Sequence, residues 1–171
     1  MPPLLHDPER GALPMTTSDE SGLETTIAGL REAAGTHLGY TDWQELTQER
    51  VDTFADATDD HQFIHVDVEK ANQTPFGGTI AHGFLTLSLL APISTQLMRV
   101  TDAVMGMNYG LDRVRFTAPL PVGAQFRGGG EILEVSDVPS GVQVKLKLIV
   151  EIQGSEKPAC VAELLVRIFG G

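Results

Sequence analysis

Residues 82–98 read HGFLTLSLLAPISTQLM, which is the most apolar segment of the chain. Apolar side chains would cover nearly every face of a helix formed by this stretch, and a helix that is apolar all round is buried inside the protein. These side chains are Phe84, Leu85, Leu87, Leu89, Leu90, Ala91, Ile93 and Leu97. Pro92 removes one backbone hydrogen bond, so we expect the helix to kink or to start anew near this residue.

After Gly110 the apolar pattern changes to a period of two, which predicts β-strands. The runs that alternate in this way, or that are apolar on both faces, lie at residues 113–118, 142–152 and 160–169. Turn-forming Pro and Gly residues separate the runs at 119–123, 128–130 and 139–141, as consecutive antiparallel strands require. A long central helix followed by such strands predicts a single α+β domain in which an antiparallel β-sheet wraps around the helix.

Shorter elements are expected upstream of the central helix. Residues 1–22 are rich in Pro, Asp, Ser, Thr and Gly, which predicts a flexible N-terminal tail and leaves residues 23–171 as the domain. The expected elements are an amphipathic helix at 23–34, a strand at 40–46, a helix capped by Thr47 and a short helix at 68–71. The helix after Thr47 would turn Val51, Phe54, Ala55 and Thr58 inward.

Composition limits the function classes. The net charge of −11 argues against a nucleic-acid partner, because a phosphate-backbone binder needs a surplus of Lys and Arg. Four arginines are candidates for a local basic patch: Arg99, Arg113, Arg115 and Arg127. No apolar run approaches the roughly 20 residues of a membrane-spanning helix, so no membrane partner is expected. The first residues lack the pattern of a secretory signal, so we expect a cytoplasmic protein. Cys160, the single cysteine, is expected to fill the core.

The most concentrated polar chemistry lies in residues 60–67, which read DHQFIHVD. Asp60 and His65 are five positions apart, and they converge on one water if the chain between them turns. Histidine suits proton transfer because its ordinary pKa of about 6.5 permits both protonation states near neutral pH. Such a pair is also compatible with capping or other structural roles.

A second constellation, Ala81-His82-Gly83, opens the central helix. The first amides of a helix have no intrahelical acceptor, so the Gly83 N–H is a candidate for polarising a carbonyl oxygen. The alternative is that glycine merely permits a turn and a close approach of helix and sheet.

Metal and nucleophile chemistry are the other readings of the polar residues. The candidate metal ligands are His61, His65, His82, Asp60 and Asp67. Residues 63–66 do not form a convincing helical pattern that would align two histidines, so we expect no metal. Ser88 and Ser94 lie in the apolar helix without the Gly-x-Ser-x-Gly elbow of a nucleophilic serine.

These motifs resemble the MaoC-like dehydratases, or hydratase 2 enzymes. That family has the loop Asp-x-Asn-Pro-x-His-x-Asp, which Asp60 to Asp67 matches except for Gln62 and Phe63, and a small-residue, His/Gln, Gly motif like Ala81-His82-Gly83. Residues 108–119 are similar to the strand that runs along the central helix in these proteins. The likeness extends over about residues 30–169, and the variant loop resembles the nodulation-protein-N-like branch.

The resemblance implies a hot-dog fold and an (R)-specific enoyl-CoA hydratase of fatty acid metabolism. The enzyme would add water reversibly to trans-2-enoyl-CoA thioesters, and it would need no cofactor beyond the coenzyme A of its substrate. Asp60 and His65 would activate the water, while the Gly83 N–H and Gln62 would contact the substrate.

The resemblance also implies an acyl-CoA or acyl-carrier-protein thioester as partner, and a homodimer. Arg113 and Arg115 are candidate contacts for coenzyme A. Two alternatives stay open: a hot-dog thioesterase, in which the carboxylate directs water at the carbonyl carbon, and a non-catalytic acyl-thioester binding module.

Overall fold

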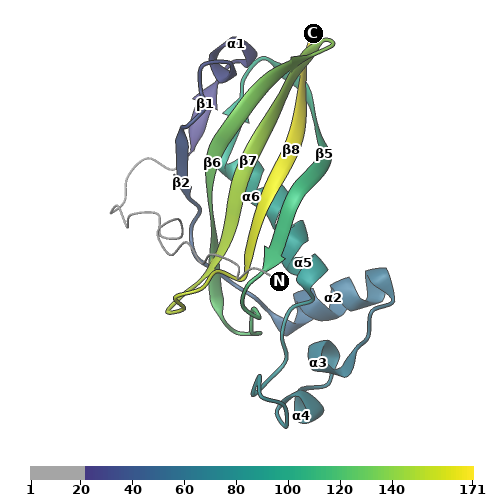
Figure 1. Ribbon diagram of the computed structural model, residues 1–171. Helices are drawn as coiled ribbons and strands as arrows, with labels where there is room; N and C mark the ends of the chain where they lie inside the picture. The colour runs from purple at the N-terminus through teal and green to yellow at the C-terminus, as the bar shows by residue number, and fades with distance from the viewer. Residues whose placement is uncertain (1–21) are drawn as a thin grey trace, which may run out of the picture.

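The computed structural model describes residues 22–171 (Figure 1), so the predicted tail at 1–22 lies, apart from Gly22, outside the described residues. Its main element is an antiparallel sheet with the strand order β2-β6-β7-β8-β5, and the short β3 also pairs with β6. The strands are β2 (His37–Tyr40), β3 (Gln44–Glu45), β5 (Ala103–Phe116), β6 (Gln125–Val138), β7 (Gly141–Ile152) and β8 (Cys160–Gly170). The predicted α+β architecture is confirmed.

The central helix lies against one face of this curved sheet (Figure 1) and is divided into α5 (Gly83–Ser88) and α6 (Leu90–Leu97). Pro92 is the third residue of α6, where its missing N–H falls in the first helical turn, so the predicted restart is confirmed. The prediction that the central helix is buried on all sides is wrong, because Phe84 is 72% exposed. The helix turns one face to the sheet and leaves the Phe84 side uncovered in the single chain.

The predicted turn at residues 128–130 is also wrong, because these glycines lie within β6. A Cβ at Gly128 would overlap the Ile93 side chain of α6, and a Cβ at Gly129 would lie 2.5 Å from the Tyr40 ring. The glycines therefore serve close packing of the helix and of Tyr40 against the strand, rather than a reversal of the chain.

Strands β7 and β8 lie at the runs predicted at 142–152 and 160–169, and both bury alternate side chains. The two strands pair from Gly141↔Phe169 to Val150↔Cys160. Cys160 is fully buried, and desolvation raises the pKa of its thiol to about 11. The prediction that Cys160 fills the core is confirmed.

The N-terminal segment departs from the predicted helix at 23–34. Residues 23–25 form β1 (Leu23–Thr25), which pairs in parallel with β4 (Met98–Val100) after the central helix. Only α1 (Ile27–Leu30) is helical, and Thr26 caps it by accepting a hydrogen bond from Gly29 N. Pairing with β4 thus overrides the helical spacing of the apolar residues. The predicted strand at 40–46 is interrupted at residues 41–43, between β2 and β3.

Three helices lie beyond the lower end of the sheet in Figure 1: α2 (Gln48–Thr58), α3 (Phe63–Val66) and α4 (Val68–Ala71). Thr47 caps α2 as predicted, by accepting from Arg50 N. Val51 and Ala55 are buried, whereas Thr58 is exposed, so the predicted inward face is wrong at Thr58. Residues 63–66, which show no convincing helical pattern in the sequence, nevertheless form α3, whose single turn is too short to give a periodic pattern.

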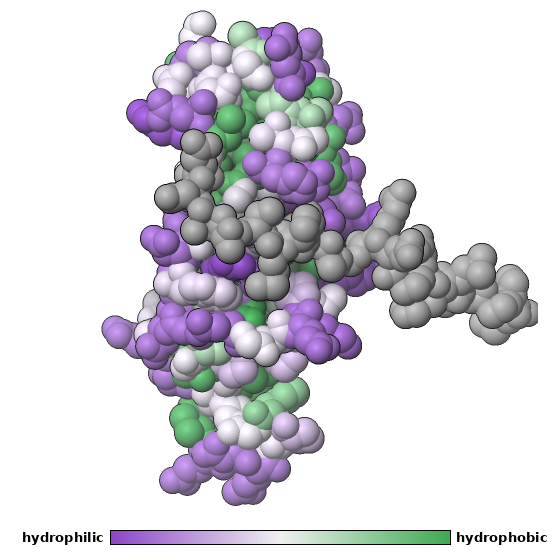
Figure 2. Space-filling view, turned by 90° about the vertical axis from the view of Figure 1, so that its left-hand side faces the viewer, coloured by the Kyte–Doolittle hydropathy of each residue, from purple (hydrophilic) through white to green (hydrophobic). Residues whose placement is uncertain are grey.

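Hydrophilic residues are spread along the whole molecule on the face shown in Figure 2, with hydrophobic groups between them. Among residues 22–171, the helices are all too short or too polar to cross a membrane.

Candidate active site

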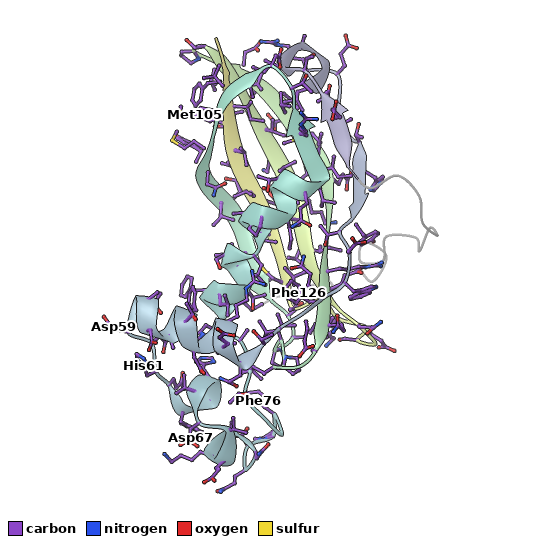
Figure 3. The ribbon with its side chains drawn as sticks, turned by 180° about the vertical axis from the view of Figure 1, so that it is seen from behind. Asp59, His61, Asp67, Phe76, Met105 and Phe126 are labelled. Carbon is purple, nitrogen blue, oxygen red and sulfur yellow. The ribbon has the colours of Figure 1, made fainter. Side chains whose placement is uncertain are left out.

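The end of α2 turns the chain so that Asp60 and His65 come together. Asp59, which follows the helix, has a left-handed backbone conformation (φ 57°, ψ 22°) that aspartate tolerates better than most residues. The chain then passes through residues 60–62 into α3, where His65 N donates to Gln62 O at 2.9 Å. Figure 3 shows Asp59 and His61 at this end of α2, with Asp67 further along the same loop.

His65 is held by a hydrogen bond to a second loop. His65 is only 5% exposed, and its Nδ1 lies 2.7 Å from Ile80 O. A carbonyl oxygen only accepts, so Nδ1 carries the proton and Nε2 keeps a lone pair. The pKa of His65 is lowered, chiefly by burial, with a further contribution from His82; the Ile80 hydrogen bond and the Asp60 carboxylate oppose the shift. The imidazole is therefore poised as a neutral base.

The side chain of Gln48, at the start of α2, links both loops. Its Nε2 donates to His65 O at 2.7 Å and to Asp52 Oδ1 at 2.8 Å, while its Oε1 accepts from Thr79 Oγ1 at 2.6 Å. Both amide hydrogens are used. Gln48 thus fixes the backbone at His65 relative to the segment that leads into α5.

Asp60, His65 and His82 form one compact group. One ligand-type atom from each lies within 4.8 Å of the others, with Asp60 exposed and both histidines buried. The two imidazole rings stack at 3.8 Å between centroids with 28° between planes. His82 Nε2 also donates to Asp60 O at 2.8 Å.

The same three residues offer a poor arrangement for a metal ion. His65 Nδ1 and His82 Nε2 are each bonded to a backbone carbonyl, which leaves one nitrogen on each ring. Lone pairs lie in the planes of the rings, and planes stacked 28° from parallel do not direct them to one point at the ~2.0 Å of a zinc–nitrogen bond. The expectation of no metal stays a prediction that this geometry favours.

Gly83 stands where the two loops meet a cavity of about 330 Å³. The cavity lies between α3, the start of α5 and the end of β5, and its lining includes Ile64, His65, Ile80, Gly83, Thr86 and Phe116. Gly83 is the first residue of α5, so its N–H has no intrahelical acceptor. A Cβ at Gly83 would lie 3.1 Å from the Phe116 ring, so glycine also permits this close contact. Both sequence-based roles of Gly83 are compatible with the structure.

Comparison with known proteins places this arrangement in a family. The family model for the MaoC like domain matches residues 30–152. The chain belongs to the MaoC-like dehydratase family. It is 50% identical over 143 residues to 3-hydroxyacyl-thioester dehydratase Z of Mycobacterium tuberculosis, covering 83% of this chain and 95% of the relative. It is 43% identical over 148 residues to nodulation protein N of Rhizobium leguminosarum bv. viciae, covering 85% and 92%.

Solved structures with the MaoC-like fold agree in architecture. The (R)-hydratase from A. caviae superposes with a TM-score of 0.65 at 22% identity, covering 78% of this chain and 94% of that one. The R-hydratase from Pseudomonas aeruginosa gives a TM-score of 0.66 at 21% identity, covering 81% and 83%. These likenesses show the hot-dog fold. Together with the family match, the relatives identify this MaoC-like protein as a hydratase or dehydratase enzyme.

Several other residues predicted for the site of this MaoC-like protein are not part of the cluster of Asp60, His65 and His82. Gln62 is exposed and precedes α3 without a side-chain capping bond. Asp67 caps α4 and pairs with Lys70 at 2.7 Å, and hydrogen bonds from Lys70 lower the pKa of Asp67. His61 is half exposed and pairs with Asp56 at 2.8 Å. Asp67 and His61 thus have structural partners.

The four arginines do not gather into one patch around the site. Arg99 pairs with Glu24 at 2.6 Å and Arg127 with Glu151 at 2.8 Å. Arg113 and Arg115 are exposed on β5, immediately before the cavity residue Phe116. Arg115 directly precedes Phe116 and Arg113 lies three positions before it, so these two remain the candidates for an anionic ligand.

Sequence reasoning missed Gln48 and assigned no role to Thr79, although Thr79 begins the segment that leads to Gly83. Gln48 resembles any polar residue after a helix cap, and Thr79 carries no motif of its own, so nothing in the sequence distinguishes them. Their role depends on a contact between residues 31 positions apart.

We expect Gln48→Leu to lower the free energy of unfolding by about 1–3 kcal/mol, because it leaves His65 O and the Thr79 hydroxyl without their partner in a partly buried place. Urea unfolding at matched protein concentration measures the change. Gln73→Leu, at an exposed residue, is the control and should stay within about 0.5 kcal/mol of the wild type. Equal effects of the two substitutions would contradict the linking role of Gln48.

Proposed function

We propose that this protein adds water reversibly to trans-2-enoyl-CoA thioesters to give (R)-3-hydroxyacyl-CoA. The observation that carries the proposal is the convergence of an exposed carboxylate, Asp60, and a buried neutral imidazole, His65, beside the amide that opens the central helix. The printed name of the 50% identical relative, a 3-hydroxyacyl-thioester dehydratase, supports the substrate class. The family resemblance implies the R configuration. We propose further that the reaction belongs to fatty acid metabolism in the cytoplasm.

Asp60 and His65 act together on one water molecule. The carboxylate and His65 Nε2 are both acceptors, so a water between them donates one hydrogen to each and turns a lone pair outward. One member of the pair takes a proton as the hydroxyl adds to C3, and a proton is delivered to C2 from the same face. The acid and base roles are therefore proposed for the pair and not divided between Asp60 and His65.

The Gly83 N–H completes the chemistry at the thioester. It donates to the carbonyl oxygen and stabilises the enolate character that develops while C3 is attacked. The exposed amide of Gln62, in the loop between Asp60 and His65, contacts the substrate. Coenzyme A is the only cofactor that enters, as part of the substrate.

We expect Asp60→Asn and His65→Ala each to lower turnover by about a hundredfold or more while the protein stays folded. The loss of the enoyl absorbance of crotonyl-CoA and longer enoyl-CoAs measures turnover, and chelation should leave the wild-type rate unchanged.

Because the pKa of His65 is lowered, the neutral imidazole persists below the ordinary value of about 6.5. Activity should therefore fall with acid at an apparent midpoint below that value.

Different outcomes separate the alternatives. Near-normal rates in both variants would remove the pair from the mechanism. Release of free coenzyme A from saturated acyl-CoA would favour a thioesterase. Binding of acyl-CoA without turnover, unaffected by either substitution, would favour a binding module.

Arg113 and Arg115 are proposed to bind the phosphates of coenzyme A. They lie two positions apart on β5, so they share a face of the strand. Among the described residues, Arg115 Nη1 donates to Val114 O, whereas Arg113 Nε lies 3.9 Å from Glu163 Oε1 in an ion pair. Arg115 is therefore the more available of the two to a phosphate.

Arg115→Ala and Arg113→Ala should each raise KM for enoyl-CoA several-fold with little change in kcat, because they remove ground-state binding. A pantetheine thioester, which lacks the nucleotide phosphates, is the matched substrate: its KM should not change in either variant. Steady-state kinetics at low salt checks this, and equal KM effects on both substrates would exclude phosphate contacts.

The protein is proposed to form a homodimer through β5, which is an end strand of the sheet. Large apolar side chains are exposed along this strand: Val104, Met105, Met107, Tyr109, Leu111 and Phe116. Figure 3 shows Met105 projecting from the outer side of the strand. An edge strand with so many exposed apolar groups is covered by another chain in stable proteins, and a two-fold axis lets a second copy cover it.

We expect Met107→Glu with Leu111→Glu to convert the dimer to a monomer, because a symmetric interface doubles each buried charge. Light scattering coupled to size-exclusion chromatography gives the mass. Val68→Glu, at an apolar residue of α4 that is 48% exposed, is the control and should leave the dimer intact. A wild-type monomer at micromolar concentration would refute the dimer.

A further inference from the structure

His82 is a buried imidazole that the mechanism above does not use. The residue is only 2% exposed and lies between α2 and α3. Its ring stacks on His65 and lies 5.0 Å from the Phe54 ring, measured between centroids. Two ionisable groups lie close to it: the His65 imidazole from α3 and the Asp60 carboxylate from the preceding loop.

The hydrogen bond to Asp60 defines the tautomer of His82. Its Nε2 lies 2.8 Å from Asp60 O, and a carbonyl oxygen only accepts, so Nε2 carries the proton. Nδ1 is buried and has no hydrogen-bond partner among the described residues. An unpaired buried nitrogen is destabilising, and an apolar residue would avoid this cost. Core packing alone therefore does not explain an imidazole at this position.

We propose that His82 is a positioning residue that fixes both members of the acid/base pair, a proposal that rests on the hydration function proposed above. Its Nε2–H holds the main chain at Asp60, and its ring face sets the plane of the His65 imidazole.

Neither catalytic group has enough contacts of its own to be fixed without His82. The Asp60 carboxylate is exposed and makes no side-chain hydrogen bond within the described residues, so its position follows that of its backbone. His65 has one ring hydrogen bond, at Nδ1, about which the ring still tilts. The flat contact with His82 removes that tilt and keeps Nε2 directed at the water. The same contact adds to the lowering of the His65 pKa.

Two substitutions separate the two contacts. His82→Phe keeps an aromatic ring against His65 but removes the donor to Asp60 O, so kcat should fall about ten- to a hundredfold while KM changes little. His82→Gln keeps an N–H donor but removes the ring, so the loss of kcat should be smaller. In His82→Gln the titration midpoint of His65, followed by NMR without substrate, should move upward, because the ring that shields it from water is gone.

His61→Gln is the matched control, because it makes the same exchange at an exposed histidine of the same loop. It should leave kcat and the His65 titration unchanged. Wild-type kcat and an unshifted His65 titration in both His82 variants would overturn the proposal.

A measurement on the wild type keeps the proposal testable even if the variants fail to fold. Nitrogen-15 NMR of the histidine rings should show a proton on Nε2 of His82, coupled across its hydrogen bond to the Asp60 carbonyl. An Nε2 without a proton, or without this coupling, would overturn the positioning role. If the NMR results hold but enoyl-CoA is not hydrated, the proposed function fails while the positioning of the pair stands.

Discussion

The hydrogen bond from His65 Nδ1 to Ile80 O is the contact on which the site depends. It selects the tautomer of His65 and joins the loop after α2 to the segment that opens α5. Ile80 N in turn donates to Ile64 O, so the two segments are tied in both directions. The segment at 79–82 is itself bound to the connection between β5 and β6, since Ala81 N donates to Leu120 O and Val122 N donates to Thr79 O. The position of His65 Nδ1 is thus set by the sheet, through backbone hydrogen bonds that depend little on side-chain identity, while the tilt of the ring is left to its contact with His82.

The glycines of β6 set the position of the other half of the site. Gly128 lets Ile93 of α6 approach the strand closely, and its N–H donates to Thr41 Oγ1 at 2.9 Å. The central helix therefore sits deep in the curve of the sheet, and its first residue, Gly83, meets the Phe116 ring at the end of β5. A larger residue at Gly128 would lift the helix and carry the Gly83 amide away from the cavity. Packing far from the reacting groups consequently determines where a thioester oxygen can be bound.

Much of this arrangement could be predicted from the sequence, and the failures share a cause. The motif at 60–67 and the period of two after Gly110 report local chemistry, so the convergence of Asp60 with His65, strands β7 and β8 and the end of β5 were found, whereas β1, β4 and β6 were not. The glycines at 128–130 were misassigned because a turn and a close helix contact demand the same small residue. The helix at 23–34 failed because β1 pairs with a strand that lies after the central helix. His82 was noticed as part of the Ala81-His82-Gly83 motif and as a candidate metal ligand, but its contact with His65 was not predicted, since that stacking depends on the three-dimensional approach of two loops.

The two departures from the family loop affect its surface rather than its backbone. Phe63 is the first residue of α3, where the family pattern has proline; proline suits this position because the N–H there has no intrahelical acceptor. The turn forms without it, since His65 N donates to Gln62 O and Asp67 N to Phe63 O, both at 2.9 Å. Proline would stabilise the fold by restricting the unfolded chain, and phenylalanine lacks this stabilisation, which is on the order of 0.4–1 kcal/mol. The phenylalanine ring is 42% exposed. The Gln62 side chain likewise makes no capping bond. The fold of the loop therefore does not require particular side chains at positions 62 and 63. Their identity matters only for what they contact outside the loop.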